Sequence, residues 1–268
     1  MQNTFFGWFG IRAAALLQAT ALLGGCVADK PVSELEQSRT ALAARDYANA
    51  ITAADTYLAR SPTGPHAAEA YYLKGRALED EAAASLGEAR SNLQQARTAY
   101  IAALKTGITD TGLEGNVRAS LADVAYWQDD YATAAEQWIA AYGMLEDRSI
   151  KAWSLYRAGV SQQRLGQYDS ADKTLQLVVQ AHPDTEPGRR AKTRIGVRGF
   201  YVQVATFADK RSADSAAQTL VRNANRISQR NTPDGKTVVL VGPFTSYGQA
   251  SGMRGTLAKQ YPDALITP

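Results

Sequence analysis

The sequence is poor in the residues that build reactive or cross-linked sites. It contains one cysteine and two histidines among 268 residues, and a single cysteine excludes a disulfide within the chain. His66 and His182 are far apart, and neither has the spacing of a metal ligand. Nucleophile-elbow, zincin, P-loop and dinucleotide-binding motifs are absent from the sequence. We therefore expect no catalytic site, no metal and no cofactor.

The N-terminus carries a hydrophobic run that is too short to cross a membrane. After Arg12, residues 13–25 (AAALLQATALLGG) are uncharged for 13 residues and end at Cys26. A bilayer-spanning helix needs about 20 apolar residues, whereas this layout is typical of a secretory signal peptide. The sequence therefore predicts a signal peptide over residues 1–25.

The end of this run resembles the lipobox of bacterial lipoproteins. In Leu23-Gly24-Gly25-Cys26, small residues precede the only cysteine of the chain. The resemblance implies lipidation of Cys26, cleavage before it, and stable attachment to a membrane facing the periplasm. We expect residues 26–32 to form the lipidated N-terminus and a linker. Val27 occupies the position at which an aspartate would retain an enteric lipoprotein at the inner membrane, which favours the outer membrane.

The rest of the chain divides into two parts of different charge and composition. Residues 27–197 carry 19 Lys+Arg against 22 Asp+Glu, whereas residues 198–268 carry 9 against 4. The first part is rich in alanine at helical spacing, and the second alternates β-branched and helical runs. We therefore predict a helical domain over residues 33–195 and a basic domain over residues 198–268.

The helical part contains a degenerate repeat. An acidic or amide residue, a tyrosine and, three residues later, an alanine recur at Tyr47, Tyr131 and Tyr168. A proline follows the first and last of these tyrosines at the same distance, and Gly75, Gly159 and Gly166 match further small positions. The pattern resembles the tetratricopeptide repeat (TPR), which implies an all-α solenoid of helical hairpins with a groove for an unknown protein partner.

The physical basis of the repeat is close approach of the helices. Alanines at the small positions let one helix pack tightly on another: Ala50, Ala96, Ala134 and Ala171. Ala54 stands where an aromatic residue is usual, and the unit that contains Gly75 and Ala96 is longer than the others. The number and register of the repeats therefore stay open.

The pattern of the C-terminal part predicts the element order βαββαβ. Strands are expected at YVQVATF, RISQR, TVVLV and DALIT, with helices after the first and third strands and a hairpin turn at Asp234-Gly235. This order predicts a ferredoxin-like α+β fold, with both helices on one face of an antiparallel sheet.

Two motifs give this part a family resemblance. Residues 202–207 (VQVATF) and 241–244 (VGPF) are similar to the first and third strands of the SPOR (sporulation-related repeat) domain. The resemblance covers residues 199–268. It implies binding of peptidoglycan glycan strands, with a preference for septal strands stripped of their stem peptides.

The same resemblance selects a candidate site. Alternation places Val202 and Val204 on one face of the first strand and Tyr201, Gln203 and Ala205 on the other. The family's glycan site is the face without helices, and Thr206 takes its Ser/Thr position. Many relatives carry arginine in the third strand where this chain has valine and leucine, which suggests apolar contact with sugar rings there, with Lys236 and Arg226 at the margin. The expected glycan-binding residues are Gln203, Thr206, Tyr201, Val238 and Leu240.

The sequence is compatible with three functions. The leading hypothesis is a non-enzymatic envelope lipoprotein that binds wall glycans and scaffolds a protein partner. The alternative is an adaptor for outer-membrane or cell-wall assembly, which the C-terminal domain only localises. A wall hydrolase is disfavoured because no catalytic acid is recognised. The basic charge of the second part could suit nucleic acid, but a secreted lipoprotein meets an anionic wall instead.

Overall fold

A computed structural model describes residues 32–84, 89–221 and 226–268 of the chain. Cys26 and the signal peptide lie outside these residues. The described chain forms two compact units, with the division between residues 108 and 109. The described residues of the first unit form four helices, α1 (Ser33–Ala43), α2 (Tyr47–Arg60), α3 (Ala67–Ala84) and α4 (Ala89–Lys105).

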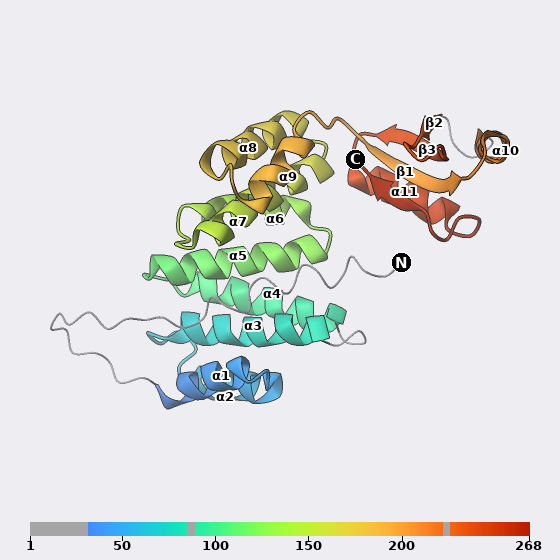
Figure 1. Ribbon diagram of the computed structural model, residues 1–268. Helices are drawn as coiled ribbons and strands as arrows, with labels where there is room; N and C mark the ends of the chain where they lie inside the picture. The colour runs from blue at the N-terminus through green and yellow to red at the C-terminus, as the bar shows by residue number, and fades with distance from the viewer. Residues whose placement is uncertain (1–31, 85–88, 222–225) are drawn as a thin grey trace. The chain divides into compact units, whose positions relative to one another are not determined.

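The second unit contains five more helices of the same kind and then a sheet domain (Figure 1). The helices are α5 (Thr111–Trp127), α6 (Tyr131–Tyr142), α7 (Arg148–Arg164), α8 (Tyr168–Ala181) and α9 (Glu186–Arg194). The sheet domain consists of β1 (Phe200–Phe207), α10 (Lys210–Val221), β2 (Ile227–Asn231), β3 (Thr237–Phe244), α11 (Tyr247–Leu257) and β4 (Leu265–Thr267). The predicted fold class is confirmed: an all-α, solenoid-like part precedes a βαββαβ domain. In the described residues, no helix is long and apolar enough to cross a membrane.

Three helical hairpins turn in the same way. The residue two positions before each repeat tyrosine has a left-handed backbone, with φ of 60° at Arg45, 59° at Asp129 and 80° at Gly166. This conformation ends the first helix of the hairpin. Aspartate follows in two of the turns, where Asp46 and Asp130 accept hydrogen bonds from backbone N–H groups of the next helix. The recurring Asp-Tyr of the sequence is therefore a helix cap followed by the first helical residue.

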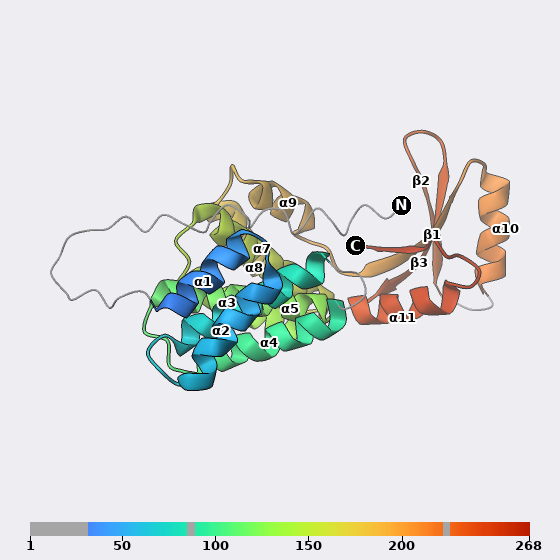
Figure 2. The same ribbon diagram turned by 90° about the horizontal axis from the view of Figure 1, so that it is seen from below.

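The small residues permit close helix contact, as predicted. The four repeat alanines are fully buried. A Cβ atom on Gly75 of α3 would come 2.4 Å from the Tyr100 ring of α4, and one on Gly159 of α7 would come 2.8 Å from Leu175 of α8. Both pairs join the two contacting helices of one hairpin, and Figure 2 shows α3 and α4 of the first pair side by side. The helices pack at a distance that only these small side chains allow.

The helices also bury charged and polar groups. In the first unit, the Tyr100 hydroxyl donates to a Glu79 carboxylate oxygen at 2.7 Å. In the second, Asp123 accepts from Arg157 at 2.9 Å and from the Trp138 ring nitrogen at 3.2 Å. All five side chains are less than 10 % exposed. Such pairs must stay intact, because a buried charge that loses its partner is strongly destabilising.

The last helical hairpin also contacts the sheet domain within the second unit. The Tyr168 hydroxyl donates to the Thr245 carbonyl at 2.8 Å. The Arg164 guanidinium lies 4.1 Å from the ring centroid of Tyr247, a cation–π distance. A Cβ on Gly166 would come 2.6 Å from the Thr245 carbonyl oxygen. At this turn, glycine therefore permits both the left-handed backbone conformation and the close approach of the Thr245 carbonyl.

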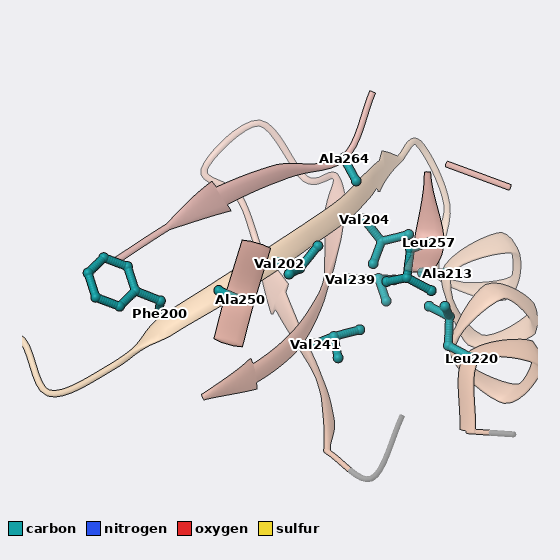
Figure 3. Packing of buried hydrophobic residues seen from close by; sticks show 10 residues of the cluster. All are labelled: Phe200, Val202, Val204, Ala213, Leu220, Val239, Val241, Ala250, Leu257 and Ala264. Atoms are coloured by element: carbon teal, nitrogen blue, oxygen red, sulfur yellow. The ribbon is translucent and has the colours of Figure 1, made fainter. Parts of the chain in front are cut away.

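The sheet has the strand order β2-β3-β1-β4, and all neighbouring strands are antiparallel. Its core lies on one face only (Figure 3). Val202 and Val204 of β1 and Val239 and Val241 of β3 pack there against helices α10 and α11. Figure 3 labels the ten buried residues of this core: Phe200, Val202, Val204, Ala213, Leu220, Val239, Val241, Ala250, Leu257 and Ala264. The opposite face of the sheet is not needed for this core.

Candidate functional site

The two polar residues of the β1 motif lie together on the face away from the core. Gln203 pairs with Leu240 of β3, and Thr206 pairs with Val238. Directly paired residues share a face of the sheet, and neither Leu240 nor Val238 belongs to the core cluster. The Gln203 amide donates to the Thr206 hydroxyl at 3.3 Å. The structure thus brings the two expected residues into contact.

A bulge in β1 makes this arrangement possible. Residues three apart in a regular strand point to opposite faces, but the pairing with β3 shifts by one residue between Gln203 and Ala205. After the shift, Ala205 pairs with the buried Val239. Alternation therefore fails after Gln203, and Ala205 does not share its face as expected. The bulge instead brings Thr206 to that face.

Two rows of side chains cross the open face. The pairings place Ser228, Leu240, Gln203 and Leu265 in one row and Arg230, Val238 and Thr206 in the other. The expected residues Leu240 and Val238 are only 4 % and 8 % exposed. They form the floor of the face and leave little apolar surface for a sugar ring to touch.

Leu265 supplies the apolar surface that the β3 residues do not. It is 47 % exposed, while its neighbours Ala264 and Ile266 belong to the core or pack against it. Leu265 was not among the expected residues, although the alternation of apolar residues in DALIT places it opposite Ala264 and Ile266. The fifth expected residue, Tyr201, pairs with Thr267 of β4 and is half-buried.

A hollow of about 440 Å³ adjoins the Gln203–Thr206 pair. One side is formed by residues 203–206 of β1 and the other by residues 260–263, which connect α11 to β4, and by Leu265. The connection contributes a glutamine, a tyrosine, a proline and an aspartate: Gln260, Tyr261, Pro262 and Asp263. Volumes of about 300–1,000 Å³ are usual for small-ligand sites, so the hollow can accept one sugar residue of a chain.

The sheet domain is similar to a known family of protein domains. Residues 196–268 match the family model of the SPOR domain. The C-terminal module is a SPOR domain. The resemblance was expected over residues 199–268, and the match begins three residues earlier and runs to the end of the chain. The predicted SPOR domain is therefore confirmed. SPOR domains are binding domains, and the match implies association with peptidoglycan in the cell envelope.

No curated protein matches the chain. A solved structure, the crystal structure of MamA protein, is 16% identical to this chain, with a TM-score of 0.47. The similarity covers 62% of this chain and 82% of the MamA chain.

Charged groups lie around the SPOR site. At the turn between β2 and β3, the Lys236 ammonium is 2.8 Å from an Asp234 carboxylate oxygen. This hydrogen-bonded ammonium lowers the pKa of Asp234 to about 2. Lys236, expected at the margin of the site, is thus engaged within its own turn, while Arg226 is exposed before β2. In the described part of the chain, no three histidine, cysteine or acidic side chains gather in a way that could hold a metal ion.

Glycine is required near the end of β3, at Gly242. Gly242, in the second motif, has a φ of 138°. A Cβ atom at this position would come 2.8 Å from the Phe200 carbonyl oxygen and 3.1 Å from the Tyr201 ring. The following Phe244 packs against the SPOR core. The second motif therefore shapes and packs the end of the strand.

Proposed function

We propose that the protein is a non-catalytic envelope lipoprotein whose SPOR domain binds peptidoglycan glycan strands, with a preference for peptide-stripped, septal strands. Its helical repeats would scaffold a protein partner. The observation that carries this proposal is the contact between Gln203 and Thr206 beside a hollow, on a sheet face that the core does not use.

The groups on this face suit a sugar chain. A glutamine amide and a threonine hydroxyl each donate and accept hydrogen bonds, as sugar hydroxyl and acetamido groups do. The exposed Leu265 offers an apolar surface to the faces of sugar rings, and Tyr261 lines the same hollow. A neutral polar pair flanked by apolar surface is the composition expected for recognition of a glycan.

Sedimentation with wall sacculi tests the proposal. A chain of residues 27–268 should pellet with sacculi, and more strongly after amidase treatment. Gln203→Ala removes one or two hydrogen bonds without touching the core, so binding should weaken roughly two- to hundredfold while thermal stability barely changes. Gln218→Ala, on the exposed surface of α10, is the control and should bind like the parent. If Gln203→Ala pellets as well as the parent, the site assignment is wrong.

The lipid anchor is part of the proposal and needs its own test. Its support is the uncharged run that ends at the only cysteine of the chain. Cys26→Ser should abolish acylation and leave a soluble or unprocessed protein. If this variant still fractionates with the membrane like the parent and is cleaved at the same bond, the lipid anchor at Cys26 is wrong.

The wall-binding function and the adaptor function differ in the importance of the protein partner that the helical repeats would bind. In the alternative, the protein is an adaptor for outer-membrane or wall assembly, and the SPOR domain only localises it. The hairpin architecture supports protein binding in either case. Cells that carry Gln203→Ala should lose wall localisation. If they keep the growth and assembly phenotype of the parent, the adaptor function is favoured.

A further inference from the structure

Arg230 has an unusual position on the SPOR sheet. Among the described residues, it is the only charged one in the four strands. Its partner in β3 is Val238, which in turn pairs with Thr206 of β1. Arg230 therefore shares the open face with the Gln203–Thr206 pair. Two strand spacings of about 4.8 Å place it roughly 10 Å from Thr206 along the row.

The surroundings of Arg230 leave its charge directed at the open face. The residue is exposed, and its neighbour in the row is a valine. At the other end of the face, the hollow beside β4 contains Asp263. The face thus has a positive side at β2 and a negative side beside β4. An anionic group of a bound chain is favoured near Arg230 and disfavoured in the hollow.

Peptidoglycan supplies such an anionic group when its stem peptides are removed. Each muramic acid carries a lactyl group whose carboxyl is joined to the stem peptide by an amide bond. Hydrolysis of this bond adds water, releases the peptide amine and leaves a free lactyl carboxylate on the glycan. We propose that Arg230 binds this carboxylate and so gives the site its preference for stripped strands. The inference rests on the proposed glycan binding.

The chemistry of arginine fits this role better than that of lysine. The planar guanidinium presents paired N–H donors that match the two oxygens of a carboxylate. An intact stem peptide replaces this carboxylate with a neutral amide, which offers a single carbonyl acceptor. Arg230 therefore distinguishes the two states of the glycan by charge and by geometry.

The test compares three forms of one wall preparation: untreated sacculi, amidase-treated sacculi, and amidase-treated sacculi whose carboxylates have been converted to methylamides. The parent chain of residues 27–268 should bind the amidase-treated form best. Methylamidation should reduce binding about three- to tenfold, because it removes the charge but keeps the strands accessible. Arg230→Gln should bind all amidase-treated material with the same weakened affinity, whether or not it is methylamidated.

Two controls make the outcome decisive. Arg254→Gln removes one positive charge from the exposed surface of α11 and should keep the parent's preference. Arg230→Lys should recover only part of it, because the ammonium keeps the charge without the paired donors. If Arg230→Gln still binds sacculi with free carboxylates better than methylamidated sacculi, the inference about Arg230 is wrong, and the proposed function is unaffected. A parent chain that binds none of the three forms would overturn the proposed function as well.

Discussion

The helical repeats and the SPOR domain use their residues in opposite ways. The helices commit small residues such as Gly75 and Ala134 to close contact and also bury polar pairs such as Asp123–Arg157. The SPOR sheet builds its core on one face and leaves the other open. Substitutions inside the helical hairpins should therefore change stability first, whereas substitutions on the open SPOR face should change binding with little effect on stability.

The largest expected effect comes from a charge in the SPOR core. Val204 is 3 % exposed and packs in the core cluster. Val204→Asp places an unpaired carboxylate there, which should cost about 3–5 kcal/mol and unfold the domain. Loss of amide-exchange protection in β1 would show this. Gln218→Asp, on the exposed surface of α10, is the control.

The same variant tests whether the two regions fold separately. The SPOR domain contains no tryptophan, whereas Trp127, Trp138 and Trp153 all lie in helices. In a chain of residues 27–268, which lacks Trp8, tryptophan fluorescence therefore reports unfolding of the second unit's helices alone. We expect its transition to survive Val204→Asp almost unchanged. A large loss of that transition would show that the contacts of Tyr168 and Arg164 with the SPOR domain couple the two regions.

A bulky residue inside a hairpin should have the next largest effect. Gly75→Val would push a side chain into the Tyr100 ring, and overpacking of this kind costs about 1–3 kcal/mol or more. Chemical denaturation followed by circular dichroism measures the loss. Gly255→Ala in α11 is the matched control, because a Cβ there meets nothing within 4 Å. It should be neutral or slightly stabilising. Equal stability of the two variants would contradict the close packing of α3 on α4.

Two exposed leucines allow a direct comparison of the regions. Leu265 of β4 and Leu177 of α8 are 47 % and 53 % exposed. If the open SPOR face binds sugar rings, Leu265→Ala should weaken binding to amidase-treated sacculi about fivefold, which corresponds to about 1 kcal/mol of lost apolar burial. Leu177→Ala should leave this binding unchanged. Both variants should melt like the parent, and equal binding by both would remove Leu265 from the site.

The sequence predicted the fold well because its local patterns agree with the structure. The two Asp-Tyr-x-x-Ala units form helices that begin at a capping aspartate. The strand and turn patterns of the SPOR domain correspond to the observed βαββαβ order. Each of these features depends on residues that are close in the sequence. The longer unit that contains Gly75 and Ala96 also folds as a helical hairpin. In it, Gly75 of α3 lies close to the Tyr100 ring of α4.

The site was predicted less completely because it depends on pairing between strands. No residue type in β1 marks the bulge that turns Thr206 to the face of Gln203. Arg230 was missed because its place beside Val238 follows from the register of β2 on β3, which neither strand shows alone. The low exposure of Val238 and Leu240 likewise results from neighbours on both sides. Their role in glycan binding stays a prediction.

The smallest expected effect concerns the repeated left-handed turn. Arg45, Asp129 and Gly166 hold equivalent positions with φ between 59° and 80°. A non-glycine residue in this conformation costs about 1 kcal/mol, so Arg45→Gly should stabilise the first unit by up to about 1 kcal/mol. Asp129→Gly should gain less, because the Asp129 carboxylate accepts a hydrogen bond from the Tyr131 hydroxyl that glycine would lose. Chemical denaturation of both variants measures the difference. If Arg45→Gly is no more stable than the parent, backbone strain at this turn does not limit the stability of the hairpin.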